Sequence, residues 1–432
     1  MNVYFISLGC SKNLIDSEQT IGLFDKNKVN LVEDPMLADV IFVNTCGFIL
    51  SAKQEAIDTI LAMANYKTIG RCQKLVAMGC FIQRYLEEVK KELSEVDYFI
   101  PIDDYDQMDK ILSEIFDLSI CGSYGKQYRY LTKDVTSSYL KIGEGCNNRC
   151  AYCAIPLIRG NFRSYPMADI INEAQDLVKQ GCQELVLIAQ DTTLYGYDFD
   201  QEYHLKDLLV ELNKLDLKWI RILYMYPDLL SKELIDTMNS LDKVLMYFDL
   251  PLQHGNNKML KLMNRRGTIE KISSMIDYIR SLNVPYVLRT TMIVGFNYET
   301  EEDFSDLLKF INEIKFDKLG AFTYSKEEDT LGYDYDEDIE ESVKQERYDR
   351  LMLEQSEISY QLNQKLIGQQ LEVLIESYDS LEEYYIGRSL YNAPDDIDGI
   401  IKIYSDNNLE LNKFYQVKII DGDSYDLVGE IC

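Results

Sequence analysis

Two series of apolar runs, each alternating with helix-spaced segments, constrain the fold more than any other feature of this sequence. In the first series, predicted strands lie at residues 3–8, 39–45 and 74–79. In the second series, they lie at residues 138–142, 184–188, 219–224, 244–249, 287–294 and 319–323. Strands that alternate with helices indicate βαβ units and parallel sheets. We therefore expect an α/β chain with an N-terminal parallel domain and a central partial (β/α) barrel.

The C-terminal part of the chain, from residue 366 on, follows a different pattern. The runs LEVLIES, YYIGRSL, GIIKIYS and YQVKIID are rich in β-forming residues, and turn signals such as Asn392-Ala393-Pro394 separate them. This pattern is typical of a small all-β barrel. A charged helical segment at residues 341–366 precedes it. We therefore predict three domains, at residues 1–120, 135–365 and 366–432.

Acidic residues outnumber basic ones by 73 to 44, which gives a formal net charge of −29. This charge disfavours nucleic acid, which is bound by clustered Lys and Arg, and it would attract a basic protein partner; the alternative is that it only keeps the protein soluble. The first residues, MNVYFISLGCSKN, lack a targeting pattern, and no run of about 18 apolar residues occurs. We therefore predict a cytoplasmic protein without membrane contact. In that reducing compartment, the ten cysteines indicate metal binding or catalysis rather than disulfides.

Three of these cysteines, Cys146, Cys150 and Cys153, follow the first strand of the predicted barrel with C-x3-C-x2-C spacing. Thiolates this close in sequence can wrap one iron–sulfur cluster, which is usually held by four cysteines. With only three local ligands, one iron keeps an open position for a substrate or cofactor. Barrel active sites lie in the loops at the carboxyl ends of the strands, where this loop is predicted to be. The loop is therefore a candidate redox site.

Two other interpretations of this loop are weaker. A structural zinc site usually needs four ligands in paired spacing, and three are present here. The run GEGCNN begins like a dinucleotide-binding G-x-G-x-x-G loop, but its last glycine is missing. The iron–sulfur interpretation is therefore preferred.

Three further cysteines, Cys10, Cys46 and Cys80, end the three strands predicted in the N-terminal domain, at intervals of 36 and 34 residues. Equivalent ends of parallel strands meet at one edge of a sheet, where open α/β proteins bind ligands. We therefore expect these thiols to converge in space. Because free cysteine is commonly buried, three independent core residues are the alternative. The other cysteines, at positions 72, 121, 182 and 432, have no such register and are interpreted as incidental.

The C-x3-C-x2-C loop after the first strand of a (β/α) barrel resembles the radical S-adenosylmethionine (SAM) superfamily. The resemblance implies a cluster whose open iron chelates SAM and whose electron splits it into methionine and a 5′-deoxyadenosyl radical. It places Tyr152 beside the adenine, Gly295 in a segment that flanks the adenine, and Gln190 and Asp191 near the methionine moiety. The alternatives are that Tyr152 only covers the loop and that the other three have core or turn roles.

Over essentially its whole length, the chain resembles the methylthiotransferases. The resemblance implies that Cys10, Cys46 and Cys80 carry an auxiliary cluster that handles sulfur, so that the cofactors are two [4Fe–4S] clusters and SAM. It also implies that the C-terminal barrel is a TRAM domain, which helps bind the macromolecular substrate. One SAM molecule would donate a methyl group to sulfur, and a second would be the radical source. No catalytic side chain is expected beyond the cluster ligands. An electron donor and a sulfur source would come from partners.

Several segments are similar to the branch of this family that adds a methylthio group to the β-carbon of an aspartate in ribosomal protein uS12. They lie at residues 7–18, 145–160, 188–196, 249–265 and 324–330. The chain departs from the family at Asn297, where proline is usual. Because proline fixes the backbone, we expect this change to alter the stiffness of the loop and not the chemistry.

The charge of the C-terminal barrel favours a protein substrate. Residues 367–432 include 14 acidic and four basic residues, a net charge of −10. An RNA-binding tail should be basic, whereas a ribosomal protein rich in Lys and Arg would be attracted to this surface, so RNA contact is expected to be secondary. Two alternatives stay open. One is a transfer-RNA adenosine methylthiotransferase with the same chemistry, and the other is a non-catalytic iron–sulfur or zinc scaffold.

Overall fold

The computed structural model describes residues 1–24, 29–125, 129–132, 135–199, 203–395 and 397–432. Its N-terminal part contains a five-stranded sheet in the order β2-β1-β3-β4-β5, in which all strand pairs are parallel. The strands are β1 (Asn2–Ser7), β2 (Asn30–Leu31), β3 (Val40–Thr45), β4 (Lys74–Gly79) and β5 (Tyr98–Ile100). The predicted parallel sheet is confirmed, and two short edge strands extend it.

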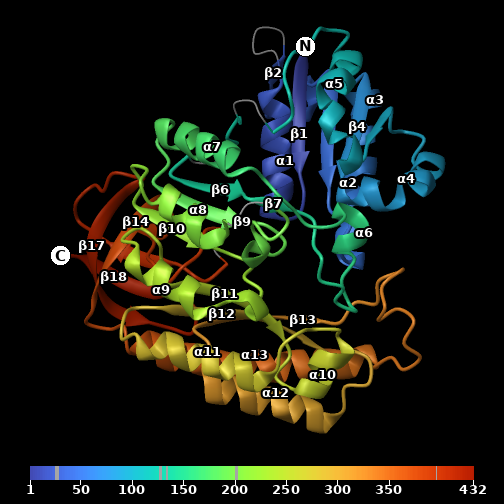
Figure 1. Ribbon diagram of the computed structural model, residues 1–432. Helices are drawn as coiled ribbons and strands as arrows, with labels where there is room; N and C mark the ends of the chain where they lie inside the picture. The colour runs from blue at the N-terminus through green and yellow to red at the C-terminus, as the bar shows by residue number, and fades with distance from the viewer. Residues whose placement is uncertain (25–28, 126–128, 133–134, 200–202, 396) are drawn as a thin grey trace.

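Helices cover both faces of this sheet because its central strands are apolar on both sides. All six residues of β3 are buried, and Phe42 packs in one hydrophobic cluster while Ile41 and Val43 pack in another. The helices are α1 (Ser11–Gly22), α2 (Leu50–Ala64), α3 (Tyr66–Ile69), α4 (Cys80–Glu92) and α5 (Met108–Phe116), with 3-10 turns at Pro35–Leu37 and Ile102–Gln107. In Figure 1 this domain stands at the top, in blue.

The central part is a partial barrel of parallel strands. Two three-stranded sheets, in the orders β10-β9-β6 and β11-β12-β13, are joined by a parallel bridge between Ile220 and Val244. The strands are β6 (Ser137–Lys141), β9 (Glu184–Ile188), β10 (Trp219–Ile222), β11 (Tyr247–Gln253), β12 (Val287–Val294) and β13 (Lys318–Thr323). The predicted partial (β/α) barrel is therefore confirmed, with β6 and β13 as its edge strands.

Helices pack against the outside of this barrel, and shorter elements decorate its loops (Figure 1). The helices are α7 (Met167–Lys179), α8 (Leu205–Leu212), α9 (Lys232–Ser240), α11 (Ile269–Ser281), α12 (Glu301–Ile314) and α13 (Glu341–Gln364). The shorter elements are β7 (Gly143–Glu144), β8 (Arg163–Ser164), α6 (Ile155–Arg159) and α10 (Asn257–Leu262), with 3-10 turns at Thr192–Leu194 and Pro227–Leu229.

The C-terminal part is a closed five-stranded barrel in the order β14-β15-β16-β18-β17, as expected from its short β-rich runs. Its strands are β14 (Gln370–Asp379), β15 (Tyr384–Arg388), β16 (Ile401–Tyr404), β17 (Lys413–Gly422) and β18 (Leu427–Ile431). Alternate apolar residues such as Val373, Ile403 and Val417 fill its interior. Among the described residues, no helix is long and apolar enough to cross a membrane.

The segment after β15 attaches this small barrel to the central one. Arg388 and Arg221 both bind the fully buried Glu184, at 2.7 and 2.8 Å. Further along, Asp398 accepts hydrogen bonds from Tyr247 and from Arg289. These partners belong to β9, β10, β11 and β12, so the segment after β15 packs against the strands of the central barrel.

Candidate functional site

The cysteine loop (residues 145–154), which carries Cys146, Cys150 and Cys153, is fixed largely by its own backbone. Gly145 opens it at φ +76°, where a Cβ atom would lie 2.2 Å from the carbonyl oxygen of Asn161, so only glycine fits. The amide of Cys153 donates to the carbonyl of Cys150 at 3.0 Å. The loop therefore turns tightly enough to bring its three thiols to one place.

Burial opposes the ionisation of two of these three thiols, Cys146 and Cys153. Burial, together with the charge of Cys150, raises the pKa of Cys146 to about 11 and also raises the pKa of Cys153. Because the thiolate is the form that binds metal, a compensating cation is required. The Arg265 guanidinium, 3.7 Å from the Cys150 Sγ atom, supplies part of it. The donor set fits an iron–sulfur cluster, whose iron ions would supply the rest.

Cys10, Cys46 and Cys80 follow three adjacent strands of the N-terminal sheet, β1, β3 and β4. The residues directly before Cys46 and Cys80 pair with each other in the sheet, so these two cysteines lie at the same level. Cys10 lies beside them, since a Cβ atom on its neighbour Gly9 would be 3.2 Å from the Cys46 Sγ atom. The structure thus places all three cysteines at one edge of the sheet.

Asn13, in the first turn of α1, links the segments that carry these cysteines. Its Nδ2 atom donates to the carbonyls of Leu8 and Thr45, at 3.0 Å each. Its Oδ1 atom accepts from the Cys80 thiol at 3.4 Å and from the Arg159 guanidinium at 2.7 Å. A single buried amide therefore fixes the relative positions of the three strand ends.

Positive charge also surrounds this second set of thiols. Burial acts to raise the pKa of Cys10, but Lys12, Arg159 and nearby backbone amides outweigh it and lower the pKa below its ordinary value. Burial, together with the charges of neighbouring cysteines, raises the pKa of Cys46 and raises that of Cys80 to about 12. Three thiols that act on one another beside two cations form a donor set that fits an anionic cluster.

Among the described residues, no three His, Cys, Asp or Glu side chains converge on a point where a single metal ion would bind. Each cysteine set instead offers three thiols that act on one another electrostatically. A [4Fe–4S] cluster suits such a set, because each cysteine binds a different iron of the cluster.

A buried ionic network joins the N-terminal domain to the cysteine loop. Asp16 of α1 accepts from Lys141 at 2.6 Å and from Arg159 at 2.9 Å. Glu144, directly before the cysteine loop, accepts from the same two cations at 2.9 and 3.0 Å. Despite its burial, these cations hold the pKa of Glu144 well below its usual range. Because Arg159 also donates to the Cys80 Sγ atom at 3.3 Å, one guanidinium contacts both halves of the site.

A cavity of about 910 Å³ opens at the carboxyl ends of β10 to β13. The N-terminal domain contributes residues 48–51, just after Cys46, and the cysteine loop contributes Tyr152. Ala393 and Ile397 of the C-terminal segment form another part of its wall. Cavities of this size hold small ligands. All three parts of the chain therefore enclose one space that adjoins both cysteine sets.

Two of the residues predicted to contact SAM lie at this space or beside the cysteine loop. Tyr152 lines the cavity, and its hydroxyl accepts from Arg265 at 3.3 Å. Gln190 donates to Glu144 at 2.9 Å, and its buried Oε1 atom has no hydrogen-bond partner in the part of the chain that the structure describes. That oxygen is an acceptor available to a ligand.

The other two predicted residues hold backbone and packing positions. Asp191 accepts from the amide of Thr193 at 3.1 Å and from Asn148 of the cysteine loop at 2.8 Å. Gly295 has φ +73°, and a Cβ atom there would lie 2.3 Å from the Cγ atom of Lys344. Asp191 thus steadies the cysteine loop, and Gly295 allows α13 to approach the end of β12.

The acidic loop at residues 325–340 reaches both the N-terminal domain and the cysteine loop. Glu327 is buried and accepts from Lys53 of α2 and Arg84 of α4, at 2.9 Å each. The amide of Gly332 donates to the carbonyl of Ala151 at 2.7 Å. This loop therefore fastens the N-terminal domain over the mouth of the barrel.

Asn297, at the position where the resemblance led us to expect proline, anchors the same loop. It is fully buried, and its Nδ2 atom donates to the Glu337 carbonyl at 2.6 Å. Proline has no donor for such a bond. The departure noted in the sequence therefore adds an interaction that sequence reasoning did not foresee.

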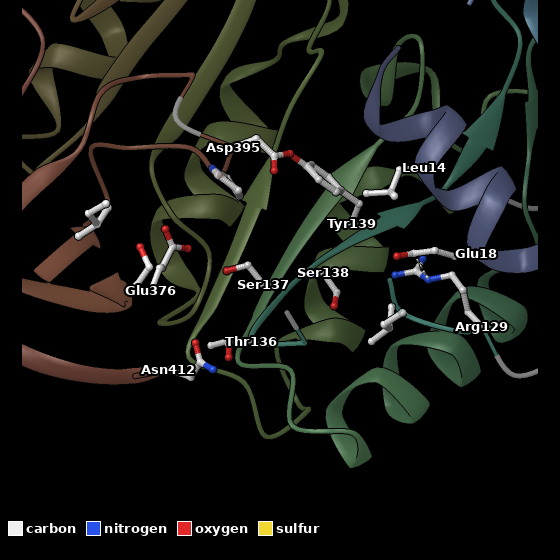
Figure 2. A pocket seen from close by; sticks show the side chains of 14 residues that line it. Leu14, Glu18, Arg129, Thr136, Ser137, Ser138, Tyr139, Glu376, Asp395 and Asn412 are labelled. Carbon is white, nitrogen blue, oxygen red and sulfur yellow. Dashed lines mark hydrogen bonds and ion pairs between the residues drawn. The ribbon is translucent and has the colours of Figure 1, made fainter. Parts of the chain in front are cut away.

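A second cavity, of about 480 Å³, lies where α1, the start of β6 and the C-terminal barrel meet. Figure 2 shows Arg129 against Glu18 on one side, at 3.2 Å, and Tyr139 pointing toward Asp395 on the other, at 2.6 Å. The described residues that line it include none of the predicted site residues. It is a cleft between domains, and its residues are separate from those of the predicted site.

Sequence reasoning missed five residues that shape the site: Lys12, Asn13, Asp16, Glu144 and Arg159. A signal was present for the first three, since they are polar residues in the opening turns of a helix that begins at a candidate ligand. Their burial is what the sequence did not show. Glu144 and Arg159 flank the cysteine loop, and Asp16, which binds Arg159, is more than a hundred residues away in sequence.

Three family models match the chain in succession. A family described as uncharacterised, UPF0004, matches residues 2–101. The radical SAM superfamily matches residues 140–311, and the TRAM domain matches residues 367–432.

Two similar proteins are both described as ribosomal protein uS12 methylthiotransferase RimO. The protein of Clostridioides difficile (strain 630) is 47% identical, and the match covers 98% of this chain and 97% of that protein. The protein of Clostridium botulinum (strain Eklund 17B / Type B) is 45% identical, and the match covers 99% and 98%. The similarity therefore extends over all three parts of the chain.

A solved structure shares the fold over a large part of the chain. The radical S-adenosylmethionine methyltransferase TsrM from Kitasatospora setae, solved with cobalamin and a [4Fe–4S] cluster bound, superposes with a TM-score of 0.56. The match covers 74% of each chain at 12% identity. This likeness is one of fold alone.

Proposed function

The chain belongs to the RimO family of radical SAM methylthiotransferases, and we propose on this basis that it adds a methylthio group to the β-carbon of an aspartate in ribosomal protein uS12. One observation carries the proposal. The two cysteine sets lie on the two sides of one domain interface, and residues next to both of them line the cavity of about 910 Å³. A side chain that enters this cavity would approach both sets.

Two [4Fe–4S] clusters and SAM are the cofactors of this chemistry. The proposed ligands are Cys146, Cys150 and Cys153 for one cluster and Cys10, Cys46 and Cys80 for the other. When bound, these groups supply three things: a methyl group, sulfur, and a radical that removes hydrogen from the substrate. In the net change, a Cβ–H bond of the aspartate is replaced by a Cβ–S bond, and the hydrogen leaves in 5′-deoxyadenosine.

We propose that Tyr152, Gln190, Asp191 and Gly295 serve the binding of SAM. Tyr152 offers an aromatic face in the cavity, between two proposed ligands of the cluster. The unpaired Oε1 atom of Gln190 would accept a hydrogen bond from the amino group of SAM. Asp191 and Gly295 would act through the cysteine loop and the end of β12, which they hold in place.

The remaining work of the protein is to position, to screen charge and to exclude water. Arg265 and Arg159 each lie beside a proposed cluster ligand, where a cation stabilises the thiolate and raises the reduction potential of the cluster. Residues 48–51 and the acidic loop cover the cavity from the side of the N-terminal domain. Water is thereby kept from a reactive intermediate.

We propose the domain boundaries 1–120, 135–365 and 366–432. The matches of three separate family models within these limits support the division. No single domain forms the whole site. The first domain supplies three of the cysteines, and the third supplies residues of the cavity wall.

The substrate is proposed to be a basic ribosomal protein, either free or within the small subunit, met by the acidic C-terminal barrel in the cytoplasm. The net charge of −10 in residues 367–432 supports attraction to such a partner over RNA. An electron donor and a sulfur source are further partners, because the net reaction consumes both.

The test is mass spectrometry of uS12 from cells with and without this chain. We expect uS12 to carry the added mass of one methylthio group only when the chain is present, and to lose it with the Cys150→Ala variant. Unmodified uS12 in both strains would overturn the proposal. If methylthioadenosine occurs in transfer RNA only when the chain is present, the RNA alternative is correct. If SAM is not turned over under reducing, oxygen-free conditions, the chain is a scaffold.

A further inference from the structure

Lys12 differs from the other buried cations of the described chain because it has no carboxylate partner. It is 6% exposed. Every other buried Lys or Arg residue pairs with an Asp or Glu; these residues are Arg129, Lys141, Arg159, Arg221, Lys344, Arg347 and Arg388. An ammonium held away from water without an anion is costly, so Lys12 needs a negative group nearby, such as the Cys10 thiolate, whose pKa it lowers, or a bound anion.

The position of Lys12 connects the sulfur side of the site with the cavity. It is the second residue of α1, two positions after Cys10. Its ammonium lies 3.4 Å from the centre of the Tyr224 ring, and Tyr224 lines the cavity of about 910 Å³. A cation–π contact steadies an ammonium but accepts none of its hydrogen bonds, so its N–H groups stay available.

Tyr224 is held firmly in this place. It has φ +58°, an unusual value for a residue other than glycine, and its amide donates to the Asp249 carboxylate at 2.8 Å. Strained backbone of this kind persists where the surrounding structure fixes it, and it is common at functional sites. Lys12 therefore rests on a rigid wall of the cavity.

Lys12 lies behind the wall residue Tyr224, and the cations that line the cavity itself are already engaged or exposed. Arg289 binds two aspartates, at 2.7 and 3.2 Å, and Lys344 binds a glutamate and an aspartate, at 2.7 and 3.2 Å. Lys326 is exposed. Among the described buried cations near the cavity and the strand-edge cysteines, Lys12 is thus the one without a carboxylate partner.

We infer that Lys12 binds the side-chain carboxylate of the target aspartate and selects it over uncharged residues, an inference that rests on the proposed function. In aspartate, the carboxylate is attached to the β-carbon that gains sulfur. An ammonium two residues from Cys10 would therefore hold that carbon beside the strand-edge cysteines. Asparagine has nearly the same shape but no charge, so it would leave Lys12 uncompensated and bind less well.

The test compares two substrates in four forms of the cluster-loaded full chain. The substrates are uS12 peptides with the target aspartate or with asparagine in its place, and the proteins are wild type, Lys12→Met, Lys12→Arg and Lys309→Met. Lys309 is a matched control, since it is exposed on α12 and pairs with Glu313. Peptide affinity and 5′-deoxyadenosine formation are measured for each combination.

We expect wild type to prefer the aspartate peptide by about 10- to 100-fold, the range of a charged hydrogen bond. Lys12→Met should reduce this ratio to near one, Lys12→Arg should keep part of it, and Lys309→Met should match wild type. A wild-type protein without preference for aspartate overturns the inference, and this result needs no variant to fold.

The same experiment separates substrate binding from charge balance at the proposed cluster. If Lys12→Met changes the reduction potential of the auxiliary cluster but keeps the aspartate preference, Lys12 serves the cluster and the inference is wrong. A wild-type protein that modifies neither peptide nor intact uS12 indicates instead that the proposed function has failed. Iron content, measured in every protein, identifies a variant that has lost its clusters.

Discussion

The two cysteine sets place three thiols together by opposite means. The loop set is Cys146, Cys150 and Cys153, and the strand-edge set is Cys10, Cys46 and Cys80. The loop set is formed by one short segment whose turn depends on a glycine and local hydrogen bonds. The strand-edge set exists only when β1, β3 and β4 pair in the correct register, because its members come from three separate strands.

This difference predicts different sensitivities. A parallel sheet whose register slips by one residue turns every side chain to the opposite face, and the strand-edge set would then be lost. The loop set would keep its geometry as long as the central barrel folds. The site therefore combines a locally encoded centre, which resembles a large superfamily, with a centre that the N-terminal fold assembles.

The largest expected effect comes from removing one ligand of the loop set. In Cys150→Ala, SAM can no longer be cleaved, so 5′-deoxyadenosine formation should fall to background. The strand-edge set should still load, and bound iron should fall by about half, since each set is expected to hold one cluster. Chromatography measures the formation of 5′-deoxyadenosine, and iron analysis measures the bound iron.

The matched change in the strand-edge set is Cys46→Ala. We expect it to keep SAM cleavage and to lose methylthio transfer, because the loop set forms without the N-terminal sheet. Full iron content in this variant, with the spectra of both clusters intact, would show that the strand edge is not a cluster site.

Both cysteine sets could be predicted from the sequence because each leaves a regular pattern in it. The loop set is visible as a spacing within one segment. The strand-edge set is visible because each cysteine repeats after one βα unit. Their ionic surroundings were not predictable in the same way. Lys141 and Glu144 look like surface residues, since Lys and Glu are seldom buried, and their burial depends on Asp16 in another domain.

The walls of the cavity show a second limit of sequence reasoning. Residues 392–394 were correctly read as a turn signal between β-rich runs. Turn chemistry says how the backbone bends and nothing about what the turn packs against. In the fold, Ala393 is buried within the central barrel and lines the cavity. A contact between domains of this kind follows from docking, which local patterns do not encode.

Arg159 tests whether the two cysteine sets depend on each other. In Arg159→Met, Asp16 and Glu144 would remain buried with Lys141 as their single cation. Breaking a buried ionic network in this way costs about 3–5 kcal/mol of the free energy of unfolding. We expect urea denaturation to show this loss, with iron lost first from the strand-edge set, whose Cys80 loses a donor.

A matched control is Arg149→Met, because Arg149 is exposed in the cysteine loop and binds Asn161 at the surface. It should change the free energy of unfolding by less than about 0.5 kcal/mol. An equal effect of both substitutions would mean that the ionic network does not hold the domains together.

Glu184 tests the contribution of the C-terminal segment, which touches neither cysteine set. Burial opposes its ionisation, but Arg388 and Arg221 lower its pKa to about 2, from an ordinary value of 4.5. A lowered carboxyl pKa stabilises the fold above the unfolded value, and this stabilisation is lost as the pH falls from 4.5 toward 2. The free energy of unfolding of wild type should therefore exceed that of Glu184→Gln by about 3 kcal/mol at pH 7, and this difference should shrink below pH 4.5.

The measurement is chemical denaturation of both proteins at several pH values, with equal cofactor content. A margin that stays constant down to pH 3 would contradict the ionic role of Glu184. At pH 7 the variant should keep SAM cleavage, since the loop set does not depend on this contact. Its uS12 modification should fall, because residues 393 and 397 form part of the cavity wall.

The smallest effect is expected at Asn297, which serves the loop that spans both cysteine sets. Asn297→Ala removes the hydrogen bond to Glu337 and should cost about 1 kcal/mol. The loop keeps its other anchors at Glu327 and Gly332, so it should loosen without detaching. Amide hydrogen exchange should rise near residue 337, while iron content and SAM cleavage stay close to those of wild type. If SAM cleavage fell as far as in Cys150→Ala, the loop would be part of the radical-generating centre, and that centre would no longer be a local one.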